Sequence, residues 1–238
     1  MKKQRLFSLL ALLLFLCAGS SRAAQPTPAG YIALTFDDGP SGRITRRLLE
    51  GLEQRNVKAT FFLCGYRLEE YPKVAPLIAA GEHEIGLHGY SHDSMKNMDT
   101  GTLLKELHRT RRLILEQTGV RAVLLRPPGG LCGETLDRVA TAEGMPLVLW
   151  SLDTKDWARQ DASFVADRII QNAEDGDIVL LHDMQMSTVD GVLRAIDALT
   201  ERGFRFVTVS RLAALRGVTL RGGVQYSRFS PTQNGSLK

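Results

Sequence analysis

Seven short apolar stretches alternate with amphipathic segments along most of the chain, and this alternation restricts the possible folds more than any other feature. The intervening segments carry apolar residues at helical spacing. Strands are expected at residues 31–34, 58–64, 83–88, 122–126, 147–152, 177–182 and 204–209. Helices are expected at residues 44–54, 68–80, 102–117, 135–143, 162–173 and 189–201, with a short helix near Leu212. Strands that alternate with helices predict an α/β fold of βα units around a parallel sheet.

The expected strands are apolar almost throughout, as is typical of strands that are covered on both faces. An open doubly wound sheet and a barrel both fit this pattern. No glycine-rich phosphate loop follows the first strand, which argues against a nucleotide-binding fold. No internal repeat or linker divides the chain, so we predict one domain.

Both ends of the chain differ in composition from this domain. Residues 1–23 combine a basic start, an apolar run and a small-residue cleavage site after Ala23, which predicts a secretory signal peptide. The apolar run is too short for a comfortable membrane span, so we expect export to the periplasm or secretion with no span retained. We assign the domain to residues 24–216. The tail at 217–238 is weakly patterned, and we expect it to fray.

Charge and cysteine content limit the partners. The chain has 30 Lys and Arg against 26 Asp and Glu, a net charge of +4. The signal peptide carries four basic residues and no acid, so the remaining chain is near neutral and offers no electrostatic case for nucleic acid. We expect a monomer. Cys64 and Cys132 follow the signal peptide, and both a disulfide and two buried thiols are compatible with the sequence.

Polar residues follow five of the expected strands. In a parallel βα fold these strand ends share one face, where active sites assemble. The five groups are Asp37-Asp38, His88 with His92, Arg126, Asp153 with Asp156-Trp157, and His182-Asp183. We therefore expect carboxylate, imidazole and guanidinium groups to meet at one site.

The residue types suggest metal-assisted hydrolysis. His88 and His92 are four residues apart, so a helical turn would place both imidazoles on one side to bind a cation. Adding Asp38 gives an Asp-His-His set that leaves a position of zinc open for water. Asp37 can act as a base, and His182 as an acid, because imidazole titrates near neutral pH. His83 and His108 lack such neighbours, and we interpret them as a strand-edge residue and an exposed helix residue.

These groups, in this order, resemble the five motifs of the polysaccharide deacetylase (NodB homology) family, carbohydrate esterase family 4. The resemblance covers residues 31–215 and implies a distorted (β/α) barrel. The segments that carry it are Thr-Phe-Asp-Asp-Gly-Pro at 35–40, His88-xxx-His92, Arg-Pro-Pro at 126–128, Asp153-xx-Asp156-Trp157 and Leu-Leu-His-Asp at 180–183.

The resemblance also implies residue roles. Asp38, His88 and His92 would bind a divalent metal ion, most simply Zn²⁺, with Co²⁺ or Ni²⁺ as substitutes. The implied acid–base groups are Asp37 as base, Arg126 orienting it, and His182 as acid tuned by a fourth-motif aspartate, for which we favour Asp153 over Asp156. The implied substrate contacts are the Gly129 amide at the oxyanion and the Trp157 and Leu181 side chains around the acetyl methyl group.

The chain departs from the family pattern at two places. Gly89 stands where Ser or Thr is usual and removes a hydroxyl that braces the loop, although Ser91 can compensate. Gly129-Gly130 follow Pro-Pro where an aromatic residue is usual, so one wall of the substrate groove is missing. The implied metal ligands, base and acid are all present, and we expect an active enzyme.

The expected activity is removal of N-acetyl groups from N-acetylglucosamine-type residues of a polysaccharide, with release of acetate. Peptidoglycan, a chitin-like oligomer and an exopolysaccharide are the candidate substrates. Two alternatives remain at this point: an esterase that removes O-acetyl groups from a glycan, and a carbohydrate-binding protein without catalysis.

Overall fold

Strand β1 (Gly30–Asp37) is the centre of a sheet in the computed structural model, which describes residues 27–231. It pairs in parallel with β2 and β6 along its second half and with β7 along its start. The other strands of this sheet are β2 (Thr60–Leu63), β3 (Glu84–Leu87), β5 (Leu152–Asp153), β6 (Ile178–His182) and β7 (Phe204–Phe206). The order is β3-β2-β1-β6-β5, so the predicted α/β fold with parallel strands is confirmed.

The sheet becomes irregular beyond β3. The expected strand at 122–126 is reduced to single bridges from Leu125 to Leu87 and Leu147. The expected strand at 147–152 is split into β4 (Leu147–Val148) and β5. The Arg126 side chain lies at this break and binds the carbonyl oxygens of Val148 and Leu149 at 2.9 and 2.8 Å. Regular strand pairs within the described residues therefore do not close the distorted barrel that the family resemblance implied.

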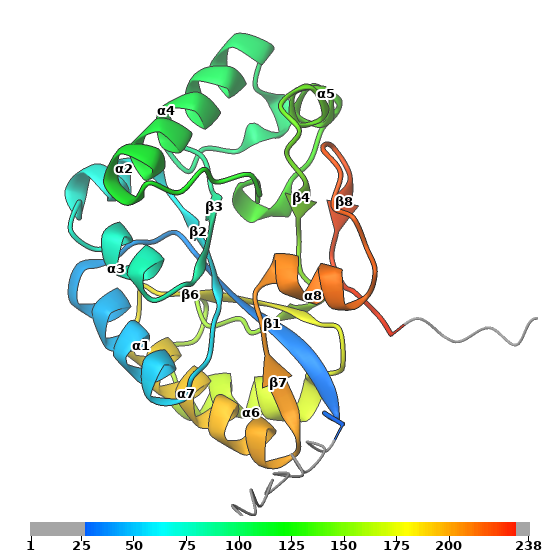
Figure 1. Ribbon diagram of the computed structural model, residues 1–238. Coiled ribbons are helices and arrows are strands. Elements are labelled where there is room, and N and C mark those ends of the chain that lie inside the picture. The colour runs from blue at the N-terminus through cyan, green and yellow to red at the C-terminus, as the bar shows by residue number, and fades with distance from the viewer. Residues whose placement is uncertain (1–26, 232–238) are drawn as a thin grey trace, which may run out of the picture.

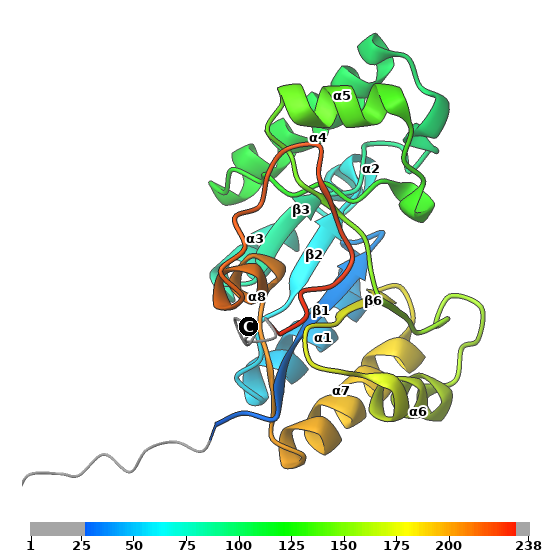
Figure 2. The same cartoon turned by 90° about the vertical axis from the view of Figure 1, so that its right-hand side faces the viewer.

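Helices gather in two groups. In both views α1 (Gly42–Gln54), α6 (Ala162–Asn172) and α7 (Met186–Glu201) lie in the lower part of the molecule, and α4 (Thr100–Thr118) and α5 (Glu134–Ala142) lie in the upper part (Figures 1 and 2). The shorter helices are α2 (Gly65–Glu70), α3 (Ala75–Ala80) and α8 (Val209–Leu215), with 3-10 turns at Met95–Asn97 and Pro128–Gly130.

The single helix expected at 68–80 is two helices, α2 and α3. Pro72 has no N–H to donate, and its ring pushes the preceding residue out of the helical region. Tyr71 accordingly ends α2 with φ −125° and ψ 58°. Pro76 is tolerated in the first turn of α3, where its N–H would have no helical partner.

The two faces of β1 and β6 pack into different cores. Side chains alternate across a strand, so Phe36 and Leu181 join the large core with helices α1 and α7. Ala33 and Ile178 point the opposite way, into a smaller core that includes α8. Asp37, at the end of β1, projects from this same second face, so the candidate site adjoins the smaller core.

The structure tests only some of the predictions about the ends of the chain and the cysteines. The predicted signal peptide at 1–23 lies outside the described residues, and the domain boundaries remain a prediction. No helix in the range 27–231 combines the length and the apolar character needed to cross a lipid bilayer. Within the same range, Cys64 and Cys132 are both free thiols, the first buried and the second partly exposed.

The start of the predicted tail does not fray. Strand β8 (Gln225–Tyr226) pairs in parallel with β4, and Figure 1 shows β8, in red, beside β4. Phe229 is only 4% exposed and stacks on Tyr226 in the smaller core. Arg228 pairs with Glu174 at 2.5 Å and with Asp177 at 3.3 Å. Residues 217–231 thus belong to the folded unit because they bury an aromatic side chain and extend a strand.

Replacing Phe229 by Ala should lower the free energy of unfolding by about 3–5 kcal/mol, the usual cost of deleting a buried aromatic ring. Denaturant unfolding, followed by far-UV circular dichroism, measures this loss. Val224→Ala is the control, because its 43% exposed side chain predicts a change within about 0.5 kcal/mol. Equal stability of the two variants would contradict the integration of this segment into the core.

Candidate active site

The carboxyl ends of β1, β3, β5 and β6 bring the predicted site residues to one edge of the sheet. Asp37 of β1 and His182 of β6 are register partners in a parallel pair. Partners in such a pair project from the same face, so the carboxylate and the imidazole lie on one side at adjacent strand ends. The structure thus brings together the two residues predicted as base and acid.

Asp38, His88 and His92 form a compact donor set. The Nε2 atoms of His88 and His92 lie 3.3 and 2.9 Å from Asp38 Oδ1, and the three ligand atoms all lie within 4.8 Å of one another. His88 Nδ1 donates to the carbonyl oxygen of Arg126 at 2.7 Å, which directs Nε2 toward Asp38. The predicted metal ligands therefore converge.

The two histidines do not meet through a helical turn, as we had expected. His92 adopts a left-handed backbone with φ 68°, and so does Gly89 with φ 82°. Asp38 is also left-handed, with φ 68°. These sharp turns, which are uncommon for residues other than glycine, fold the loop back so that the imidazole centroids are 5.1 Å apart. Spacing alone does not reveal such a turn.

The donor set fits a divalent cation. Among the described residues, no donor makes a hydrogen bond of good geometry to the buried Oδ1 atom of Asp38. Burial raises the pKa of Asp38, but the close approach and the charge of His88 and His92 outweigh this effect and hold the pKa below its usual range. A carboxylate oxygen that faces two imidazole nitrogens is the arrangement in which zinc retains an open coordination position.

Asp37 is held apart from the predicted metal ligands by a buried ion pair. Its side chain is 3% exposed, and its Oδ1 accepts a hydrogen bond from Arg126 Nη1 at 2.8 Å. Its other oxygen, Oδ2, lies 3.7 Å from His88 Nε2. Arg126, which is fully buried, therefore orients the carboxylate with one oxygen toward the donor set.

Asp156, not Asp153, is the partner of His182, and this corrects our expectation. Asp156 Oδ1 lies 2.9 Å from His182 Nδ1, and Asp156 Oδ2 accepts from the His182 amide at 2.8 Å. Asp153 instead pairs with Lys155 Nζ at 2.7 Å. Burial lowers the pKa of His182, but the hydrogen bond and charge of Asp156, with the charges of Asp37 and Asp38, raise it to about 9.

The predicted apolar contacts need a second correction. Leu181 is fully buried and packs with Phe36 in the large core, on the opposite face from His182. Leu180 shares the face of His182, because it lies two positions before it on the same strand. Trp157 is 59% exposed, on the loop after β5. Counting by two from His182 would have found Leu180 in the sequence.

The Pro-Pro-Gly-Gly turn leaves one backbone amide available. Gly130 N and Leu131 N donate to Pro127 O and Pro128 O, whereas Gly129 N makes no backbone hydrogen bond within the described residues. Gly129 is left-handed, with φ 65°, and a Cβ atom there would approach only Leu131, at 3.7 Å. The amide predicted for the oxyanion thus makes no backbone hydrogen bond in the described range, and the ring of Trp150 lies beside the neighbouring Gly130.

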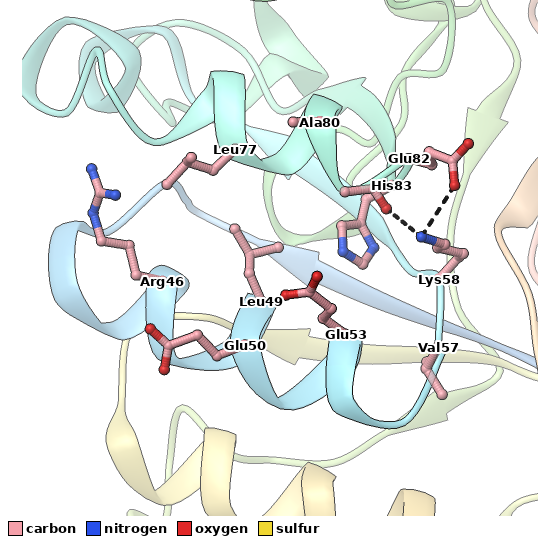
Figure 3. Close-up of a pocket in the computed structure, with 11 residues that line it drawn as sticks. Arg46, Leu49, Glu50, Glu53, Val57, Lys58, Leu77, Ala80, Glu82 and His83 are labelled. Carbon is pink, nitrogen blue, oxygen red and sulfur yellow. Dashed lines mark hydrogen bonds and ion pairs between the residues drawn. The ribbon is translucent and has the colours of Figure 1, made fainter.

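A separate hollow has no part in this site. Figure 3 shows it between α1 and α3, with a volume of about 520 Å³. Lys58 and His83 line it just before β2 and β3, at the opposite end of the strands from the site, and Lys58 binds Gly81 O at 2.7 Å. His83 Nδ1 accepts from Ala59 N at 3.1 Å, and burial together with the charge of Lys58 lowers its pKa to about 4. His83 thus lies directly before β3, at the edge of the strand, where we had placed it.

Comparison with known proteins identifies relatives of this chain. The model of the polysaccharide deacetylase family matches residues 24–148. Peptidoglycan-N-acetylglucosamine deacetylase PgdA of Listeria monocytogenes is 34% identical over 207 residues, which are 87% of this chain and 43% of that protein. A peptidoglycan-N-acetylglucosamine deacetylase of Bacillus cereus is 34% identical over 192 residues, which are 79% of this chain and 90% of that protein. The chain therefore spans less than half of the Listeria protein.

A solved structure is also similar. The family 4 acetyl xylan esterase from Clostridium thermocellum, in complex with a cobalt ion, superposes with a TM-score of 0.78 at 32% identity. The similarity covers 83% of this chain and 98% of that chain.

Replacing Asp38, His88 or His92 by Ala should abolish retention of zinc, because each removes one of three protein ligands. Zinc content after dialysis, measured by inductively coupled plasma mass spectrometry, checks this. His108→Ala is the control, because His108 is exposed on α4 and pairs with Glu143 away from the donor set. Unchanged zinc content in all three variants would contradict the ligand assignment.

Replacing Asp156 by Asn should lower the pKa of His182 by more than one unit, because it removes the carboxylate that favours the imidazolium while leaving the burial that opposes it. Titration of the His182 ring by NMR in the metal-free protein measures the shift. Asp153→Asn should leave the pKa of His182 within a few tenths of a unit of the parent value. A lower pKa of His182 in Asp153→Asn and an unchanged one in Asp156→Asn would restore the original assignment of Asp153.

Proposed function

Because the chain belongs to the polysaccharide deacetylase family, we propose that it hydrolyses the N-acetyl groups of N-acetylglucosamine-type residues in a polysaccharide and releases acetate. The observation that carries this proposal is the pairing of Asp37 and His182 in register beside the Asp38, His88 and His92 donor set. Hydrolysis of an amide needs a base for water, an acid for the departing amine and stabilisation of the oxyanion. Asp37 can supply the base, His182 the acid, and the Gly129 amide a hydrogen bond to the oxyanion.

The protein groups divide the proton transfers between them. Zn²⁺ is the cation we propose, with Co²⁺ or Ni²⁺ as substitutes, and when bound it would supply Lewis acidity toward the acetyl carbonyl. Asp37, oriented by Arg126, accepts the proton of the attacking water. The Gly129 amide donates to the developing oxyanion.

His182 acts as the acid. Its Nδ1 is bound to Asp156, so the proton that can be transferred is on Nε2. A raised pKa keeps the ring protonated at neutral pH, and this form can deliver a proton to the sugar nitrogen as the C–N bond breaks. Leu180, which replaces Leu181 in this role, and Trp157 would then border the acetyl methyl group.

We further propose that the protein acts outside the cytoplasm, either in the periplasm or after secretion. The predicted signal peptide at 1–23 supports this location. Relatives named for peptidoglycan favour that polymer over chitin-like oligomers and exopolysaccharides as the substrate.

Ester hydrolysis is the second candidate, because a structural neighbour is an acetyl xylan esterase. The two reactions differ in the leaving group, since an amine must be protonated to depart whereas a sugar alkoxide is a better leaving group. His182→Ala should therefore impair amide hydrolysis more than ester hydrolysis. Equal loss on both substrates would contradict this division of labour.

Purified protein should release acetate from N-acetylglucosamine oligomers and peptidoglycan, lose this activity with a chelator, and regain it with zinc. Coupled enzymatic detection of acetate measures the release. Asp37→Asn should keep its zinc and lose about 100-fold or more in kcat, because it removes the base but no metal ligand. Release from O-acetylated xylan alone would favour the esterase, and bound zinc with no release from any glycan would reject both hydrolases.

A further inference from the structure

The loop between His88 and His92 is held on one side by the backbone amides of Gly65 and Tyr66, which donate to the carbonyl oxygens of Gly89 and Tyr90 at 3.0 Å, and on the other by a carboxylate that binds its amides. Glu106, on helix α4, directs its Oε2 atom at this loop. That oxygen accepts from the Tyr90 amide at 2.7 Å, the Ser91 amide at 2.9 Å and the Ser91 hydroxyl at 3.2 Å. Hydrogen bonds to an ionised acceptor are roughly twice as strong as those between neutral groups. The backbone between the two histidines is therefore anchored to the longest helix of the described chain.

The two histidines depend on this anchor to different extents. His88 is buried, and its ring is fixed through the Nδ1 hydrogen bond to the Arg126 carbonyl. The His92 side chain is 42% exposed, and no residue in the described range forms a hydrogen bond with its Nδ1. Its backbone is also left-handed, a conformation that persists only where the surroundings enforce it. His92 thus depends on the backbone that precedes it.

The backbone conformation at position 89 favours the glycine that replaces the usual hydroxyl residue there. A Cβ atom on Gly89 would lie 2.7 Å from the side chain of buried Met95, and the backbone there has φ 82°. A serine at this position would therefore be strained. The bracing comes instead from Ser91, whose hydroxyl donates to Glu106 and accepts from the Asp93 amide at 3.2 Å.

We propose that Glu106 is a positioning residue that holds His92 in the geometry for binding the metal ion. It contacts neither the donor atoms nor the reacting groups, and acts through the amides of Tyr90 and Ser91. The proposal rests on the metal-dependent function above, but it concerns affinity for the ion and can be tested without any substrate.

Glu69 provides a matched control. It contacts the same loop through the Tyr90 hydroxyl at 2.8 Å and also pairs with Arg109 at 2.9 Å. These bonds fix a side chain and not the backbone, and the Glu69 side chain is 44% exposed. Removing Glu69 therefore perturbs the outside of the loop and leaves both amides bound to Glu106.

The test compares Glu106→Ala, Glu106→Gln and Glu69→Ala in the full chain. Zn²⁺ affinity is measured by competition with a chromophoric chelator, the ligand geometry by the visible absorption of the Co²⁺-loaded protein, and stability by thermal unfolding of the metal-free protein. Glu106→Ala should weaken zinc binding about 10- to 100-fold, as expected for loss of a group that orients a ligand. It should also change the Co²⁺ spectrum.

Glu106→Gln should recover most of the affinity, because its amide oxygen can still accept from both backbone N–H groups. If Glu106→Ala fails to fold, Glu106→Asp decides the question, because its side chain is one methylene shorter and should weaken zinc binding, whereas parent-like affinity would overturn the proposal. Glu69→Ala should bind zinc within about twofold of the parent protein. Parent-like affinity and Co²⁺ spectrum in Glu106→Ala would overturn the proposal, as would a loss of metal-free stability with an unchanged spectrum. Failure of the parent protein to bind zinc would overturn the metal-dependent function as well, whereas zinc binding without acetate release would overturn the function alone.

Discussion

The guanidinium group of Arg126 joins the segments on which the rest of the site depends. It is fully buried, and it binds Asp37 and Thr35 of β1 together with the carbonyl oxygens of Val148 and Leu149. A charge this deep is tolerated only when it is paired and its donors are satisfied. Here one side chain meets both conditions by linking the central strand to the irregular side of the sheet.

This interaction lies where the sheet is irregular. The carbonyl oxygens of Val148 and Leu149 accept from the Arg126 side chain at the point where the segment at 147–153 divides into two short strands. The backbone of Arg126 contributes as well, because its carbonyl oxygen accepts from His88. One residue therefore orients the proposed base with its side chain and a proposed metal ligand with its backbone.

The sequence was sufficient to predict the α/β class, most strands and helices, and the five groups of polar residues. These predictions rest on apolar runs and on the common edge of parallel strands, which depend on local pattern. The choice between Asp153 and Asp156 depends on the path of the loop after β5, which no local pattern describes. Leu180 was missed for a different reason. Strand alternation places Leu180 on the same side of the sheet as His182, but we assigned the family's leucine to Leu181, the next residue along the strand.

The features that the sequence concealed are those in which the backbone departs from regular geometry. Asp37 and His182 belong to paired strands, so the ladder itself fixes their relative position. Asp38 and His92 have left-handed backbones outside any ladder, and each needs contacts from elsewhere in the chain. Two paired strands can place a proton donor beside an acceptor. Three ligands around one metal ion must point toward it from different directions, whereas side chains of parallel strands project only perpendicular to the sheet. The candidate metal site is therefore built on loops, and helix α4 and the Arg126 carbonyl group contact the two segments that carry its histidines.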